Sequence, residues 1–97
     1  MLTYTPPQSI AHAREMQETL RHQVLLKDSA TAPHTIAGVD VGIHRATQRA
    51  KAAIVVLTFP QLERVEQTTA FAPADFPYVP GLLSFRELPA ILAALQQ

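Results

Sequence analysis

Residues 77–87, which read Pro-Tyr-Val-Pro-Gly-Leu-Leu-Ser-Phe-Arg-Glu, constrain the fold of this chain more than any other segment. Pro77 and Pro80 fix the backbone on both sides of Tyr78 and remove two N–H donors, so a regular helix or central strand cannot run through them. This arrangement favours a tyrosine held at a surface over one that fills a core. Because Glu87 follows a few residues later, the segment predicts an aromatic side chain near a carboxylate.

The sequence before this segment predicts one helix followed by an antiparallel sheet. Apolar residues recur every three or four positions over residues 8–27, so we expect a helix within residues 8–30. The short connections that follow favour antiparallel pairing in sequence order. A continuous apolar run at residues 52–59 is typical of a strand covered on both faces. Three strands are expected within residues 35–72, at 35–43, 52–59 and 62–72.

A second helix is expected over residues 84–97, where leucine and isoleucine recur at helical spacing. Ser84 and Glu87 have the spacing of a capping box, which favours a helix start at Ser84. Pro89 conflicts with this register because a proline there loses a helical hydrogen bond, so a start nearer Leu88 is the alternative. The 97 residues together predict a single α/β domain.

Asp40 and Glu87 are the candidate metal ligands. Asp40 lies within an apolar strand, where aspartate is disfavoured, and its strand face also carries Gly38 and Gly42. These small neighbours leave space for a ligand such as Mg²⁺, although a turn at the strand end is the alternative. For Glu87 the alternative is helix capping. Two carboxylates that converge on one divalent ion suit metal-assisted cleavage of a phosphodiester.

Tyr78 has two interpretations, as a loop anchor packed on the core or as a wedge that enters the base stack of a nucleic acid. Gly81 lacks a side chain, so its backbone can approach an extruded base. Among the histidines only His44 follows the Asp40 strand, and none is assigned a metal role. The candidates for phosphate contacts, for which a solvated position is the alternative, are Arg45, Arg49, Lys51 and Arg86.

Composition excludes several classes of protein. The formal net charge is zero, so any attraction for nucleic acid must be local. The chain has no cysteine, which excludes disulfides and thiolate metal sites and fits a reducing compartment such as the cytoplasm. No apolar run approaches the length of a membrane span, and the first residues do not have the pattern of a signal peptide.

Four stretches of the chain resemble endonuclease V, the deoxyinosine-directed repair endonuclease. They are Ile-Ala-Gly-Val-Asp-Val-Gly at 36–42, the apolar run and Phe-Pro-Gln-Leu-Glu within 52–63, Phe76 to Glu87, and Pro-Ala-Ile-Leu at 89–92. The resemblance implies a ribonuclease-H-like fold, here truncated to a helix, a three-stranded antiparallel meander and a second helix. It also implies nicking of DNA on the 3′ side of deoxyinosine, with Mg²⁺ as cofactor and Mn²⁺ as a substitute.

The same resemblance implies roles for individual residues. Asp40 and Glu87 match metal-binding and catalytic carboxylates, and Tyr78 matches the wedge that fills the gap left by the flipped hypoxanthine. Pro77 and Pro80 brace this tyrosine. Gly81 and Leu83 match positions that line the base pocket. Some members of the family prefer inosine in RNA, so RNA is the alternative partner to inosine-containing DNA.

The chain departs from the family in its length, because a third metal-binding aspartate, a histidine and a basic residue of the family have no counterpart in it. It therefore resembles the N-terminal half of an endonuclease V, residues 1–97 being one partial domain. The missing ligands predict that these residues alone have little or no activity. The unpaired sheet edge predicts marginal stability or self-association, and a complementing C-terminal half is the other expected partner. The alternatives are an inactive remnant and a small module that binds nucleic acid or another protein.

Overall fold

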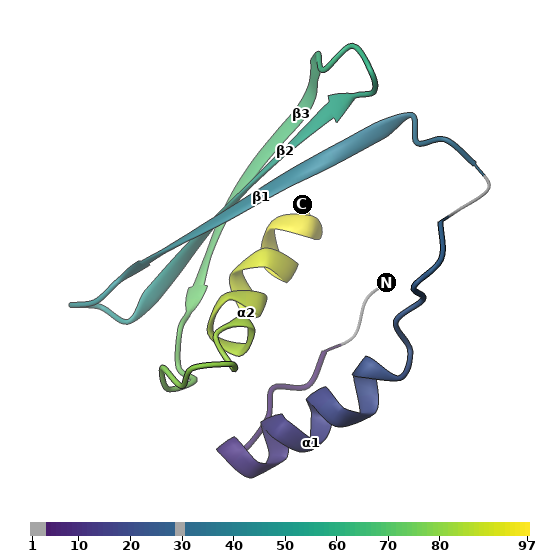
Figure 1. Ribbon diagram of the computed structural model, residues 1–97. Helices are drawn as coiled ribbons and strands as arrows, with labels where there is room; N and C mark the ends of the chain where they lie inside the picture. Colours follow the sequence, from purple (N-terminus) through teal and green to yellow (C-terminus); the bar gives the residue numbers. More distant parts are fainter. Residues whose placement is uncertain (1–3, 29–30) are drawn as a thin grey trace.

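The computed structural model describes residues 4–28 and 31–97, which form two helices and one sheet (Figure 1). The sheet has the order β1-β2-β3 with both neighbouring pairs antiparallel, as the short connections predict. The elements in chain order are α1 (Ile10–Arg21), β1 (Thr35–His44), β2 (Arg49–Thr58), β3 (Arg64–Pro73) and α2 (Ser84–Leu95). The predicted arrangement of helix, antiparallel meander and helix is confirmed.

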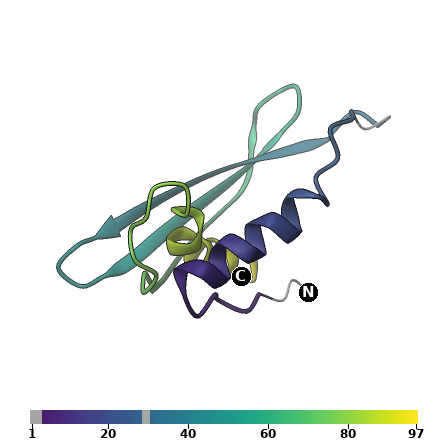
Figure 2. The ribbon, with the colours of Figure 1, turned by 60° about the horizontal axis from the view of Figure 1, so that its bottom comes forward.

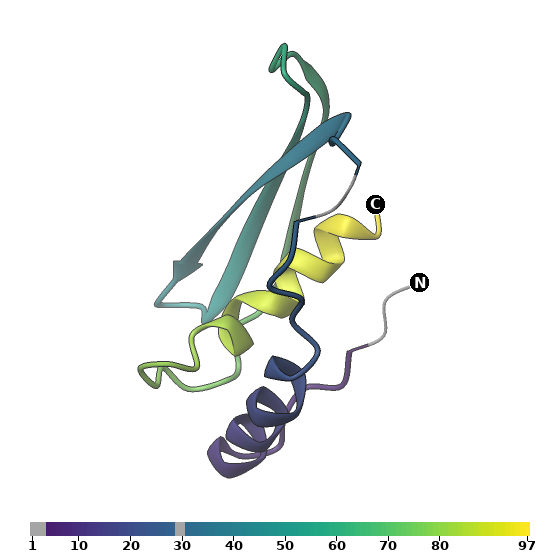
Figure 3. The ribbon, with the colours of Figure 1, turned by 45° about the vertical axis from the view of Figure 1, so that its right-hand side comes forward.

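The sheet has one covered face and one open face. Val39 pairs with Ile54 and Val41 with Ala52, and because side chains alternate along a strand, these four lie on the same face. On this face α2 packs against the sheet, while the opposite face carries no layer within the described residues (Figure 3). The prediction that residues 52–59 are covered on both faces is therefore wrong for this structure.

Alanine forms most of the contact between α2 and the sheet. The small side chains allow the helix axis to approach the strands closely, and Ile54 is the one large buried residue among them. Val41 and Ile43 of β1 pack against the edge of this cluster. Its other buried members are Ala50, Ala52, Ala70, Ala72, Ala74, Ala90 and Ala94.

The hairpin between β1 and β2 is tighter than predicted. The turn occupies residues 45–48, and Gln48 takes a positive φ of 54° to close it. Arg49 and Lys51, which were expected in a polar connection, are therefore part of β2. The predicted turn at Pro60 is confirmed, and β3 starts at Arg64 rather than at residue 62.

Helix α1 begins at Ile10 because the Ser9 hydroxyl accepts a hydrogen bond of 3.0 Å from the His12 N–H, which caps the first turn. It ends at Arg21, several residues before the end that periodicity predicts; residues 29 and 30 of that prediction lie outside the described residues. Beyond Arg21 the apolar side chains have no surface to pack on, as Leu26 is 97% exposed. A helical pattern without tertiary packing gains too little to extend the helix.

Helix α2 begins at Ser84, but not through the predicted capping box. Its N-cap is Leu83, which makes no side-chain cap, and the first turn is closed by bonds from Phe85 N–H to Leu82 O and from Arg86 N–H to Leu83 O. Pro89 lies inside the helix, so the expectation that the helix starts nearer Leu88 is also wrong. Packing of Phe85 and Ala90 on both sides of the proline outweighs the lost bond.

Neither helix of the described part of the chain has the length and apolar character needed to cross a membrane.

Substitution of Ala90 by leucine tests the close approach of α2 to the sheet. Ala90 is fully buried in the alanine cluster, so the larger side chain should separate the layers and lower the free energy of unfolding by roughly 1–3 kcal/mol. Urea unfolding followed by circular dichroism measures the change. Ala11→Leu, at an exposed position of α1, is the matched control and should change the stability little; equal effects would contradict the packing described.

Candidate metal and nucleic-acid site

The segment around Tyr78 and the start of α2 form one hollow with β1. The hollow has a volume of about 660 Å³ and is walled by the loop, the first turns of α2, the end of β1 and the β1–β2 turn. The structure thus brings together five predicted site residues from three segments of the chain, namely Arg45, Tyr78, Leu83, Arg86 and Glu87. The remaining lining residues are Val41, Ile43 and Gln48.

Hydrogen bonds to the backbone carbonyls at its two ends hold the loop that carries Tyr78. At one end the Arg86 Nη1 donates to the Phe76 carbonyl at 2.7 Å, and at the other the Gln17 Nε2 donates to the Gly81 carbonyl at 2.7 Å. Gln17 belongs to α1, which lies beside the loop (Figure 2). Two clamps and two prolines leave Tyr78 little freedom relative to α2, which favours a preorganised site.

Gly81 is required for the path of this loop. Its φ is +88°, a region that residues with a side chain rarely adopt. A Cβ at this position would meet no atom within 4 Å, so the requirement comes from backbone strain rather than from a clash. The space around Gly81 leaves its backbone accessible, and the approach of an extruded base to it stays a prediction.

Arg86 has a structural role, because its side chain binds two other segments of the fold. Besides the Phe76 carbonyl, its Nη2 reaches the Gln48 Oε1 at 3.4 Å, and its Nε is buried without a partner in the described part of the chain. The guanidinium therefore ties the Tyr78 loop to the β1–β2 turn. The phosphate contact proposed from sequence stays a prediction for Arg86, and it would have to use the same nitrogen atoms.

Tyr78 itself is 69% exposed, so the alternative that it is a loop anchor packed on the core is wrong. The anchoring contacts belong to its neighbours, because Val79 and Phe76 pack against a small cluster of Ala13, Leu82 and Phe85. An exposed ring on a fixed loop is what a wedge requires.

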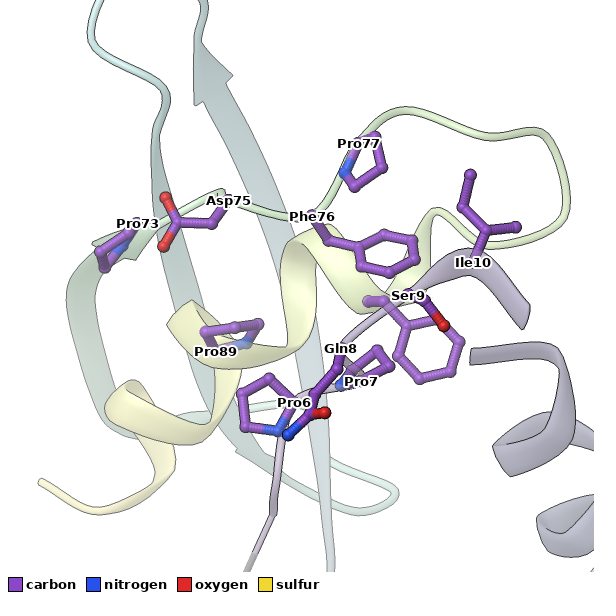
Figure 4. A pocket seen from close by; sticks show the side chains of 11 residues that line it. Pro6, Pro7, Gln8, Ser9, Ile10, Pro73, Asp75, Phe76, Pro77 and Pro89 are labelled. Atoms are coloured by element: carbon purple, nitrogen blue, oxygen red, sulfur yellow. The ribbon is translucent and has the colours of Figure 1, made fainter. Parts of the chain in front are cut away.

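The two proline positions differ in their surroundings. Pro80 is exposed beside Gly81. Pro77 lines a second hollow of about 490 Å³, where the N-terminal Pro6 and Pro7 lie against the start of α2 and near Phe76 (Figure 4). Neither proline lines the hollow of Tyr78, and the prediction that Pro77 and Pro80 belong to the substrate-binding segment stays a prediction.

The two candidate carboxylates lie on different sides of the sheet. Glu87 lines the hollow, and its carboxylate has no hydrogen bond or ion pair within residues 4–28 and 31–97. Asp40 lies within β1 rather than at its end, so the turn alternative is wrong. Its position alternates with Val39 and Val41, which places its side chain on the open face of the sheet. Its Oδ1 accepts a bond of 3.0 Å from the Val41 N–H.

Asp40 does not line the hollow of Glu87, so the structure does not bring the two predicted metal ligands together in one hollow. The outer edge of β1 has no neighbouring strand in the described sheet, and α2 contacts β1 directly. Added Cβ atoms at Gly38 and Gly42 would meet nothing within 4 Å, so the space around Asp40 is open, as predicted. Carboxylate oxygens suit Mg²⁺. However, the described residues contain no group of three or more metal-ligating side chains, so they supply only part of a complete ligand set.

The predicted basic cluster divides between the two faces of the sheet. Arg45 lines the hollow with Glu87, whereas Arg49 and Lys51 lie on the open face. There they flank Phe71 of β3, with the Arg49 Cζ and the Lys51 Nζ each 5.6 Å from the ring centroid. The sequence analysis missed Phe71, although its alternation with Ala70 and Ala72 was the signal that it faces away from the core.

The whole chain has sequence relatives of known family. The family model for endonuclease V matches residues 18–97. The chain belongs to the endonuclease V family. The endonuclease V of Rippkaea orientalis is 48% identical over 95 residues, which cover 98% of this chain and 42% of the relative. The Alkalilimnicola ehrlichii enzyme is 49% identical over 88 residues and 39% of its length, so the chain spans about two-fifths of these relatives.

Solved endonuclease V structures share the arrangement described above. The crystal structure from Streptomyces avermitilis superposes with a TM-score of 0.85 at 41% identity, covering 93% of this chain and 40% of that one. Endonuclease V of Ciona intestinalis, solved with a 24mer DNA containing an inosine, superposes at 0.78 with 28% identity over 90% of this chain and 38% of that one. The predicted ribonuclease-H-like fold is thereby confirmed for the segment present here.

Replacement of Gly81 by alanine tests the backbone requirement of the endonuclease V loop. The strain of a positive φ should lower the free energy of unfolding by roughly 1–2 kcal/mol. Gly38→Ala, in an extended strand with equally open surroundings, is the control. Thermal or urea unfolding should separate the two variants, and equal stabilities would show that the loop relaxes to another conformation.

Replacement of Gln17 by alanine tests the clamp from α1. In a Tyr4→Phe background Tyr78 is the only tyrosine, and the chain has no tryptophan, so tyrosine emission reports on this loop alone. We expect Gln17→Ala to lower the fluorescence anisotropy of Tyr78 because one end of the loop is released. Glu15→Ala, on the same helix and exposed, should leave the anisotropy unchanged; an unchanged value in Gln17→Ala would contradict the clamp.

Proposed function

We propose that this chain carries the N-terminal part of a divalent-metal-dependent endonuclease that nicks DNA on the 3′ side of deoxyinosine. The observation that carries the proposal is the shared hollow of Tyr78 and Glu87 on an endonuclease V fold. An exposed, braced aromatic ring beside an unpaired carboxylate joins a means of recognising a nucleotide with a means of holding a metal ion. The Ciona relative bound to inosine-containing DNA supports the choice of substrate.

In this proposal Asp40 and Glu87 would hold Mg²⁺, and Mn²⁺ can substitute for it. The bound ion would polarise the scissile phosphodiester, lower the pKa of an attacking water and stabilise the leaving oxygen. The donors fit a hard cation, and neither carboxylate is engaged in an ion pair with a basic side chain of the described residues. Two protein carboxylates with water and phosphate oxygens can bind Mg²⁺, although weakly.

The loop residues would act on the nucleotide rather than on the phosphate. Tyr78 enters the stack in place of the extruded base, because its ring is exposed and its backbone is clamped at both ends. The Gly81 backbone and Leu83 border the space that the base would enter. Arg45 lies in the same hollow and is the basic residue best placed to contact a phosphate there.

A segment corresponding to the remainder of the relatives would supply the further ligands, either in the same protein or as a complementing chain. We expect residues 1–97 alone to nick slowly, since electrostatic stabilisation of the transition state depends on the full ligand set. Recognition of inosine in RNA is an alternative that the nicking assay addresses, and self-association stays a prediction. A cytoplasmic location stays a prediction.

The direct test combines metal binding with nicking. Mn²⁺ should raise the thermal midpoint of the wild-type chain, and Asp40→Asn or Glu87→Gln should each abolish the rise because one of two ligands is lost. Asp75→Asn, on an exposed residue outside the hollow of Tyr78, is the control and should retain it. A rise that persists in the variant lacking both acids would show that the metal binds elsewhere.

Nicking is measured on duplexes that differ only in inosine or guanine at one position, with an inosine-containing RNA as a third substrate. The wild-type chain should cleave the inosine duplex with Mg²⁺, and Tyr78→Ala should lose most of the preference for inosine. Equal cleavage by the wild type and by Asp40→Asn would identify a contaminating nuclease. Metal binding without any cleavage would favour an inactive or incomplete protein.

A further inference from the structure

The open face of the sheet carries another hollow, distinct from those of Tyr78 and Pro77, and none of the predicted roles explains it. It has a volume of about 670 Å³ and lies over the β1–β2 hairpin and β3. Phe71, the aromatic residue in it, is 56% exposed although it lies within the regular pairing of β2 and β3, opposite Lys51. The other lining residues are Gly42, Ile43, His44, Thr47, Arg49 and Lys51.

The charges around this hollow are all of one sign. Arg49 and Lys51 lie on the same side of β2, and no acidic residue occurs between Asp40 and Glu63 in the sequence. Both cations are held near the Phe71 ring, so the site combines an aromatic face with local positive charge in a protein whose net charge is zero. An exposed aromatic residue between cations is the arrangement with which proteins bind single-stranded nucleic acid without reading its sequence.

The hollow lies close to the candidate site along the chain. Ile43, near the end of β1, lines both this hollow and the hollow of Tyr78. Asp40 lies on the same face as Phe71, one pair of residues along the strand from the row formed by Gly42, Lys51 and Phe71. This separation is about 7 Å along β1, and Phe71 lies two strands, or about 10 Å, across the sheet, a distance that one nucleic-acid strand can span.

We propose that Phe71, Arg49 and Lys51 form a subsite for the nucleic-acid strand that flanks the cleaved position. A base stacks on the exposed ring of Phe71, and the two cations exchange part of their contact with the ring for the adjacent phosphates. The assignment of the strand as substrate rests on the proposed function, whereas the binding chemistry rests only on this hollow. Because stacking suits every base, the subsite contributes affinity and not inosine recognition.

Binding of fluorescein-labelled dT20 and U20, which contain no inosine, tests the subsite separately from nicking. Fluorescence anisotropy should show Phe71→Ala weakening binding by about tenfold, and Phe71→Tyr restoring it. Arg49→Ala and Lys51→Ala should each reduce the slope of log affinity against log salt by about 0.7. Phe59→Ala and Lys27→Ala, which change an exposed aromatic residue and an exposed cation elsewhere, are the matched controls.

A second measurement detects stacking directly. In Phe71→Trp the indole is the only tryptophan of the chain, and stacking of thymine should quench its emission, whereas Phe59→Trp should show no quenching. Wild-type affinity in Phe71→Ala, or equal losses in the control variants, would overturn the proposal. Binding of dT20 but not U20 would assign the subsite to DNA. Binding of U20 with the same affinity as dT20 would show that the subsite accepts both DNA and RNA. Loss of nicking with intact dT20 binding would contradict the proposed function and leave the subsite standing.

Discussion

The contact between α2 and the alanine face of the sheet is the interaction on which the candidate site depends. Ala90 and Ala94 are fully or almost fully buried against alanines of β2 and β3, so α2 lies close to the strands and in a fixed register. This contact sets the distance of Glu87 from the end of β1 and directs the loop before it over Val41 and Ile43. A larger residue at this interface would move the carboxylate and the Tyr78 loop together.

Much of this architecture could be predicted from the sequence, because hydrophobic alternation and short connections leave few arrangements for three strands. The details that failed depend on tertiary contacts. The apolar period of α1 continues to Val24, yet the helix ends at Arg21, since nothing covers its last apolar residues. The capping box at Ser84 fails because Leu83 begins the helix with a tight first turn.

The site was predictable in part for the same reason. The sequence identifies Tyr78, Gly81 and Glu87 by type and order, and the structure places Tyr78 and Glu87 at one hollow. The sequence alone does not show that Arg86 donates to the Phe76 carbonyl. It also does not show that Gln17, from a helix distant in sequence, holds Gly81. Nor does it separate Arg45 from Arg49 and Lys51, because the end of the turn at Gln48 decides which face each cation occupies.

The outer edge of β1 gives Asp40 a second physical role. An unpaired strand edge can dock another strand, and natural proteins discourage this with charges or prolines. The ten residues of β1 contain no proline and no lysine, arginine or glutamate, so Asp40 is the only acid along it. The carboxylate that would bind a cation is therefore also the main electrostatic barrier to edge-to-edge assembly, and neutralising it should favour the growth of extended sheets.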